Sequence, residues 1–178
     1  MKGVLIYDVP TDEKGTYSKI RSKIGQHALR VNLSVWILDW AQKDRVEALI
    51  KSIHEEGSHA DIRILKFDES SEPELMVMAR EALSNQIEHI RVALTKRMKD
   101  LQVELTKAEE PAVINAKRRG AILHAKRELA TAKTLAFTFN IMQDVDDLYQ
   151  TSVKMVATEL ALLNKELSSP VIFVGAGK

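Results

Sequence analysis

The alternation of apolar and polar residues predicts three short β-strands within the first 70 residues. An apolar run from Gly3 to Tyr7 is closed by Asp8, and a stretch from about Leu29 to Trp40 has apolar side chains at every other position. A third run extends from Ala60 to Phe67. These stretches are rich in β-branched and aromatic residues, which fit the pleated surface of a sheet. We therefore expect a small sheet in the N-terminal part of the chain.

Helical segments separate these strands. The first is expected to begin at Thr11 or Asp12 and to end near Gly25, and the second to run from about Lys43 to Glu55 and to stop at Gly57. Glycine after a helical stretch favours its termination. The resulting order is strand, helix, strand, helix, strand.

The second expected strand has two interpretations. It is either one long bent strand from Leu29 to Trp40, or two strands with a turn near Asn32 to Ser34 or near Asp39. A hairpin at this position would give the usual arrangement of a split β-α-β domain.

After Ser70 the apolar residues recur at spacings of three and four, which are typical of amphipathic helices. Helices of about 35 residues span about 50 Å and must bury their apolar stripes against each other or against a second subunit. We expect an antiparallel hairpin that turns near Pro111 and a third helix after Asp144. The three stripes comprise Leu83, Ile87, Ile90, Leu94, Met98, Leu101 and Leu105; Ile122, Ala125, Leu129, Ala132, Leu135 or Ala136, Phe139 and Met142; and Val153, Val156, Leu160, Leu163 and Leu167.

This change of pattern divides the chain into two expected domains. Residues 1–70 form the sheet domain, and residues 71–169 form a helical coiled-coil region. A last apolar run, from Val171 to Val174, is strand-like and ends at Gly175. If this run joins the sheet, the helical region is an insertion into the small domain.

The composition limits the compartment and the kinds of partner that we expect for the protein. The chain has no cysteine, which excludes disulfides and thiolate metal sites and fits a reducing compartment. No apolar run approaches the roughly 20 residues needed to cross a bilayer, and the run after Lys2 is too short for a signal peptide. We therefore expect a cytoplasmic protein without a membrane partner. The net charge of +1 gives no overall basic field, so a nucleic-acid surface requires local clustering of cations.

Three short motifs lie on the expected strands. They are Tyr7-Asp8-Val9, the sequence RVNLSVW from Arg30 to Trp36, and the segment from Asp61 to Ile64. Their residues and spacing resemble the CRISPR-associated Cas-two family over about residues 2–68. The resemblance implies a ferredoxin-like fold that dimerises through its sheet. It also implies either metal-dependent nucleic-acid cleavage or a structural role beside the Cas-one integrase.

The chain departs from that family in three respects. Asn32 stands where glutamine is usual, and Trp36 stands where phenylalanine is usual. The long helical region has no counterpart in the compact family, and related folds without a CRISPR function, such as VapD-like toxins, remain alternatives. The expected fold class is α+β, a ferredoxin-like sheet domain followed by a long helical hairpin or a three-helix coiled-coil region.

Asp8 is the metal ligand and catalytic residue that the resemblance supplies. A hard cation such as Mg²⁺ or Mn²⁺ prefers oxygen ligands and keeps several waters. One carboxylate per subunit suffices only if a homodimer brings two together and substrate phosphate completes the shell. The alternative is that Asp8 caps the first helix or the turn before it, as aspartate does well.

Five residues are candidates for contact with nucleic acid. Arg30 and Ser34 lie in the segment that carries the resemblance, and the Ser34 hydroxyl either contacts phosphate or forms a structural hydrogen bond within the sheet. The helical region adds Arg119, Lys126 and Lys133, which recur every seventh residue and share a helix face. Such a face can follow a phosphate backbone. Alternatively, it is a solvated face that pairs with acids of a neighbouring helix, among them Glu104, Glu109 and Glu159.

Two weaker metal hints are the pair His54 and His59 beside Glu55 and Glu56, and an acidic group at Asp144, Asp146 and Asp147. Solvated helix ends account for both at least as well. The first functional hypothesis is a nucleic-acid-associated protein with a dimeric core and metal-dependent endonuclease activity at Asp8. The second is a non-catalytic scaffold whose helical region docks a protein partner.

Overall fold

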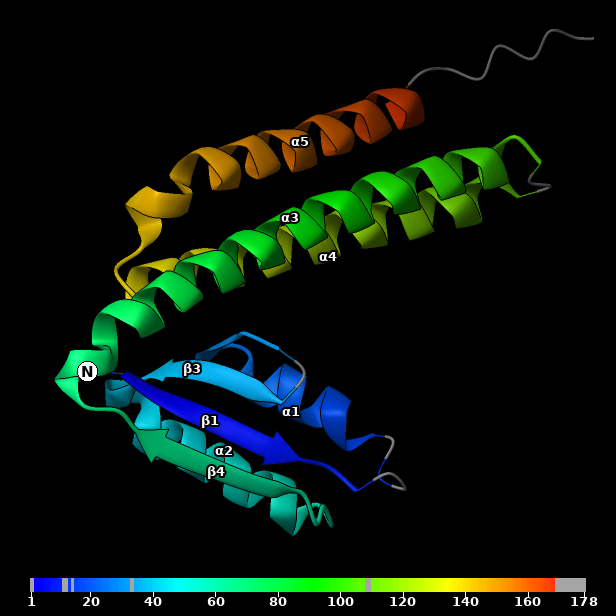
Figure 1. Ribbon diagram of the computed structural model, residues 1–178. Helices are drawn as coiled ribbons and strands as arrows, with labels where there is room; N and C mark the ends of the chain where they lie inside the picture. Colours follow the sequence, from blue (N-terminus) through cyan, green and yellow to red (C-terminus); the bar gives the residue numbers. More distant parts are fainter. Residues whose placement is uncertain (1, 11–12, 14, 33, 108–109, 169–178) are drawn as a thin grey trace, which may run out of the picture. The chain divides into compact units, whose positions relative to one another are not determined.

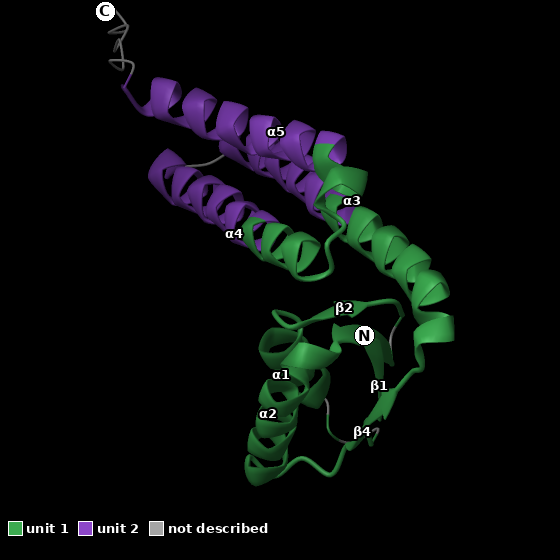
Figure 2. Cartoon of the chain, turned by 90° about the vertical axis from the view of Figure 1, so that its left-hand side faces the viewer, with its two compact units in different colours: residues 1–87, 130–146 green, residues 88–129, 147–178 purple. Residues whose placement is uncertain are grey.

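The protein is an α+β protein that forms two compact units. The computed structural model describes residues 2–10, 13, 15–32, 34–107 and 110–168. One unit comprises residues 1–87 with 130–146, and the other comprises residues 88–129 with the segment from 147 onward (Figure 2). The units part within the long helices, and the expected boundary between residues 70 and 71 stays a prediction.

The sheet of the first unit is antiparallel throughout. Across the described residues its strand order is β2-β3-β1-β4, so β1 is hydrogen-bonded along both edges. The expected strands at Gly3–Tyr7 and Ala60–Phe67 are confirmed. The four strands are β1 (Lys2–Asp8), β2 (Ala28–Arg30), β3 (Val35–Asp39) and β4 (Asp61–Lys66) (Figure 1).

Helices α1 (Thr16–Ile24) and α2 (Lys43–Glu55) cover one face of this sheet (Figure 2). Leu5 and Tyr7 of β1 point into the core beneath them and are buried. Burial of one large apolar side chain stabilises the folded state by about 1.5–3 kcal/mol. This core is therefore the main source of stability for the sheet with α1 and α2, which we call the small domain. Its other members are Val9, Ile20, Ile24, Ala28, Trp36, Leu38, Val46, Ile53 and Ala60.

The interpretation of Leu29 to Trp40 as one bent strand is wrong, and the alternative of two strands is confirmed. The turn falls at Asn32, whose Oδ1 accepts hydrogen bonds from the backbone N–H of Ser34 at 3.0 Å and of Val35 at 2.9 Å. Asparagine favours such turns because its side chain replaces a backbone acceptor. A short 3₁₀ turn, η1 (Trp40–Gln42), then leads into α2, whose expected bounds are confirmed.

The first helix, α1, begins at Thr16, and Glu13 and Gly15 are not helical. Thr11 and Asp12, where the helix was expected to start, lie outside the described residues. Backbone N–H groups of Glu13 and Thr16 donate to the carbonyls of Pro10 and Glu13. The expected end near Gly25 is confirmed. At Gly25 a side chain would collide with the Arg21 carbonyl and crowd the Trp36 ring, which accounts for the glycine.

Three long helices follow β4 within the described residues, after the 3₁₀ turn η2 (Glu69–Ser71). They are α3 (Glu72–Leu105), α4 (Pro111–Thr138) and α5 (Met142–Ser168) (Figure 1). The turn expected near Pro111 is confirmed, and the third helix begins two residues before Asp144. The expected run from Val171 to Val174 lies outside the described residues.

The second unit is built on the predicted apolar stripes. Ile90, Leu94 and Leu101 of α3 are buried, as are Leu129 of α4 and Leu163 of α5. Leu105, Val153 and Leu160 are half-buried, and Leu167 is 49% exposed. None of the helices described is long and apolar enough to cross a membrane.

Within the second unit, ion pairs join the helices. Arg118 of α4 is buried and donates to Glu166 of α5 at 2.5 Å, while Lys117 lies 3.6 Å from Glu104 of α3. The first pair is the more constraining, because a buried guanidinium without its acid is strongly destabilising.

A buried ion pair closes the N-terminal end of β1. Lys2 is 7% exposed; its Nζ lies 2.6 Å from Asp39 Oδ2 and 5.0 Å from the Phe139 ring centroid. The backbone N–H of Ala41 donates to Asp39 Oδ1 at 2.9 Å. Burial acts to raise the pKa of Asp39, but the hydrogen bonds from Lys2 and Ala41 outweigh it, and the pKa is lowered.

We predict that Asp39 contributes to acid sensitivity. Because its pKa is lower in the folded state, its contribution is present above the unfolded value and is lost as pH falls below about 4. Asp39→Asn will be less stable than the wild type at pH 7, by about 1–3 kcal/mol, and its stability will fall less between about pH 5 and 2. Urea unfolding at a series of pH values measures both.

Asp44→Asn is the matched control, because the Asp44 side chain is fully exposed. An Asp39→Asn variant with the same pH dependence as the wild type would contradict the assignment.

Candidate functional site

Asp8 is exposed at the end of the interior strand of the sheet. Side chains alternate along β1, so Leu5 and Tyr7 face the core while Val4, Ile6 and Asp8 lie on the other face. Ile6 is 40% exposed, and Asp8 is exposed as well. The carboxylate therefore projects to solvent from one end of a firmly paired strand.

A second carboxylate lies opposite Asp8. In the antiparallel register Asp8 pairs with Asp61 of β4. The guanidinium of Arg63 donates to Asp61 from Nε at 3.0 Å and from Nη2 at 2.6 Å. These hydrogen bonds lower the pKa of Asp61. The charge of Asp61 is thus balanced by Arg63 of the same strand. The Asp8 side chain, in contrast, has no ionic partner among the described residues.

The turn between β2 and β3 lies at the same end of the sheet. The carbonyl of Ser34 accepts the Tyr7 backbone N–H at 3.0 Å, which places Ser34 beside the last residues of β1. Arg30 ends β2 at this turn, and its Nε donates to the Asn32 carbonyl at 3.0 Å. The structure thus brings Arg30 and Ser34 to the same end of the sheet as Asp8. Asp61 and Arg63 also lie there, although the sequence did not point to them as site residues.

Asp8 does not cap the first helix, so that part of the alternative is wrong. A cap of the turn before the helix stays a prediction, because Thr11 and Asp12 lie outside the described residues. The residue at the N-cap of α1 is Gly15, and no side chain accepts a hydrogen bond there. Asp8 precedes the first residue of α1 by eight positions.

Glu13 orders the segment after β1 and is a residue that sequence reasoning missed. Its carboxylate accepts hydrogen bonds from Thr16 Oγ1, Ser58 Oγ and the His59 backbone N–H, each at 2.7 Å. The N–H of His59, then Ser58 and Thr16, lower its pKa. Since Ser58 and His59 precede β4, this carboxylate ties together the two segments that flank the Asp8–Asp61 pair.

The residues behind the two weaker metal hints are engaged in contacts that serve the fold. The ring of His54 is hydrogen-bonded to the Ala60 carbonyl at 2.9 Å. Asp144 lies in the first turn of α5 and accepts from Arg80 at 2.9 Å. Among the described residues no three His, Asp or Glu side chains come together. A cation held by Asp8 would need further ligands from water, substrate or a second chain.

The basic residues of α4 divide into paired and unpaired cations. Lys117 and Arg118 pair with acids of neighbouring helices, as the alternative interpretation expected for this region. Arg119, Lys126 and Lys133 are exposed, and none has an acidic partner in the described part of the chain. Arg119 reaches Asn164 Oδ1 at 3.4 Å, and Lys133 lies 5.9 Å from the Phe137 ring centroid.

Comparison with protein-family models, with curated proteins and with solved structures found no match. The resemblance to the Cas-two family stays a prediction.

We predict that the Asp8 carboxylate destabilises the folded protein. Like charges directly opposite each other on paired strands are destabilising, so Asp8→Asn will raise the melting temperature by about 1–3 °C. Asp61→Asn will not give this rise, because it relieves the same repulsion but also removes the charge that pairs with the Arg63 guanidinium. Thermal unfolding at low ionic strength measures both. A clear fall in the melting temperature of Asp8→Asn would show that Asp8 serves the fold.

Proposed function

We propose that the small domain is ferredoxin-like. The support is its order of elements, β-α-β-β-α-β, together with the antiparallel strand order β2-β3-β1-β4. In a split β-α-β arrangement each helix connects two parallel strands with a third strand between them. Here β1 and β2 flank β3, and β3 and β4 flank β1. Both helices lie on one face. On the other face Val4 and Ile37 are buried, whereas Ile6 and Leu65 are 40% and 45% exposed.

We further propose that the protein acts on nucleic acid and that a homodimer uses Asp8 to hold Mg²⁺ or Mn²⁺ for phosphodiester cleavage. The observation that carries this proposal is the exposed carboxylate of Asp8, which has no ionic partner among the described residues and lies at the end of the sheet where Arg30 ends β2. A carboxylate suits a hard cation, and guanidinium groups suit the phosphate that the cation would meet.

The number of ligands that the cation needs supports a dimer. Mg²⁺ in phosphate chemistry takes one or two carboxylates and completes its octahedron with water and phosphate oxygens. Asp61 is held by the guanidinium of Arg63, so the second carboxylate would be the Asp8 of another copy. When bound, the cation would lower the pKa of an attached water and stabilise charge that develops on the phosphate. Asp8 would hold the cation at the end of the sheet, and Ser34, whose carbonyl accepts the Tyr7 N–H, would be the neighbouring group that orients the phosphate. Arg30 comes to the same end from the face that α1 and α2 cover.

The exposed cations of α4 support a nucleic-acid partner. Arg119, Lys126 and Lys133 recur at seven-residue intervals and remain free of acids within the described residues, whereas Lys117 and Arg118 are paired. Each phosphate that a cation neutralises releases counterions and steepens the salt dependence of binding.

A cleavage assay tests the catalytic proposal. Single- and double-stranded RNA and DNA are incubated with Mg²⁺ or Mn²⁺ and with wild type, Asp8→Asn or the exposed control Asp44→Asn. Wild type and Asp44→Asn should cleave one of these substrates. Asp8→Asn should be slower by about 100-fold or more, because several kcal/mol of metal stabilisation are lost. Equal cleavage by all three proteins would remove Asp8 from the mechanism.

Binding is tested separately from cleavage. The double variant Lys126→Gln and Lys133→Gln should weaken binding and reduce the slope of log K against log salt by about 0.7–0.9 for each lost contact. Lys117→Gln is the control, because Lys117 is already paired with Glu104. An unchanged slope in the double variant would exclude α4 as a contact surface.

A non-catalytic scaffold is the second candidate. Val92 and Val103 of α3 are 54% and 51% exposed, and three helical turns separate them, so they share a face that suits protein docking. Nucleic-acid binding without cleavage in any metal would favour this role.

A further inference from the structure

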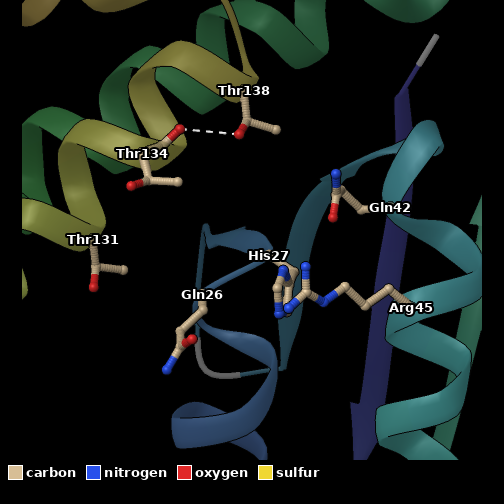
Figure 3. A pocket seen from close by; sticks show the side chains of 7 residues that line it. All are labelled: Gln26, His27, Gln42, Arg45, Thr131, Thr134 and Thr138. Carbon is tan, nitrogen blue, oxygen red and sulfur yellow. Dashed lines mark hydrogen bonds between the residues drawn. The ribbon is translucent and has the colours of Figure 1, made fainter.

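A polar pocket of about 320 Å³ lies within the first unit, away from the Asp8 end of the sheet (Figure 3). Gln26 and His27 line it from the segment before β2, and Gln42 and Arg45 line it from the start of α2. Ala28 pairs with Leu38 near the Lys2 end of β1, which is the opposite end from Asp8. The volume falls at the lower end of the range for small-molecule sites.

The charge in this pocket has one sign. Arg45 is exposed, contributes a guanidinium to the lining, and has no acidic partner among the described residues. No carboxylate from the described part of the chain lines the pocket. Burial and the charge of Arg45 lower the pKa of His27, so its ring is neutral near pH 7. A fixed cation surrounded by neutral hydrogen-bonding groups suits an anion.

Threonines line the pocket opposite Arg45, and they favour a different kind of ligand group. Thr131, Thr134 and Thr138 of α4 are spaced by three and four residues and so share a helix face. Thr134 Oγ1 donates to the Ala130 carbonyl at 3.1 Å, and Thr138 Oγ1 donates to the Thr134 carbonyl at 3.0 Å (Figure 3). With their hydrogens engaged, these two oxygens can only accept, so they suit a ligand that donates hydrogen bonds.

We propose that this pocket binds a small sugar phosphate, with the phosphate on Arg45 and the sugar hydroxyls on Thr134 and Thr138. An inorganic anion would satisfy the cation and leave the threonine oxygens without donors. A neutral sugar would satisfy the threonines and leave the guanidinium unpaired. The sugar phosphate has both groups, whether it comes as a free metabolite or as part of a nucleotide.

Calorimetric titration of the full chain tests this proposal with ribose 5-phosphate, AMP, inorganic phosphate and ribose. Ribose 5-phosphate or AMP should bind more tightly than inorganic phosphate, and ribose should not bind measurably. The ester that binds more tightly shows whether the natural ligand is a free sugar phosphate or a nucleotide. Arg45→Gln should weaken that binding by about 10-fold or more, since a charged hydrogen bond is lost.

Matched variants separate the pocket from general effects. Thr134→Val should weaken binding of the sugar phosphate by about 3- to 10-fold and leave inorganic phosphate unchanged. Thr158→Val is its control, because Thr158 makes the same bond to a helix carbonyl, that of Lys154, at 2.9 Å. Arg127→Gln removes an exposed guanidinium that does not line the pocket. Circular dichroism checks that each variant is folded.

Three results would overturn the proposal. The first is that neither ester binds at millimolar concentration. The second is that Arg127→Gln and Arg45→Gln weaken binding of the ester equally. The third is that the ester binds no more tightly than inorganic phosphate and that Thr134→Val does not change its affinity. The test is independent of the function proposed for Asp8, because Asp8→Asn should bind the ester as the wild type does.

Discussion

The pairing of β1 along both of its edges is the constraint on which the small domain depends. Because side chains alternate along a strand, one register decides every position at once. Leu5 and Tyr7 enter the core beneath α1 and α2, and Asp8 is then obliged to lie on the other face. A slip by one residue would expose both core side chains and bury the carboxylate, at a cost of several kcal/mol. The exposed position of Asp8 is therefore a consequence of the packing.

The two ends of this sheet differ in chemistry. At one end Asp8 and Asp61 face each other across paired strands, and only Asp61 is neutralised, by Arg63. At the other end Lys2 and Asp39 form a buried pair, and a pocket opens around Arg45 with no acid in its described lining. One end offers an anion that is suited to a metal ion, and the other offers a cation that is suited to a phosphate. A small domain can thus hold two independent sites.

Periodic patterns made much of this fold predictable from the sequence. The period of two located the strands at Gly3–Tyr7 and Ala60–Phe67, and spacings of three and four located the long helices and the bounds of α2. These patterns work because burial of one face is a property of the local sequence. Asn32 was also readable as a turn residue, which is why two strands were weighed against one.

Contacts between distant segments were not predictable. Glu13 meets Ser58 and His59, which lie 45 and 46 residues away, and nothing in its neighbourhood signals this. The pairing of Asp8 with Asp61 depends on strand order, and the pocket combines residues from three separate segments. The motifs that resemble those of the Cas-two family selected Asp8, Arg30 and Ser34 as candidates. Only the register placed them at one end of the sheet.

The most direct test of the proposed metal site at Asp8 is paramagnetic broadening by Mn²⁺ in amide NMR spectra of the wild type. Asp8, Ser34 and Asp61 should lose intensity first at low Mn²⁺, while His27 and Arg45 at the far end should keep theirs. Excess Mg²⁺ should restore the signals, because both ions prefer the same oxygen ligands. Broadening centred on the acidic start of α5, with the Asp8 signals unchanged, would contradict the account.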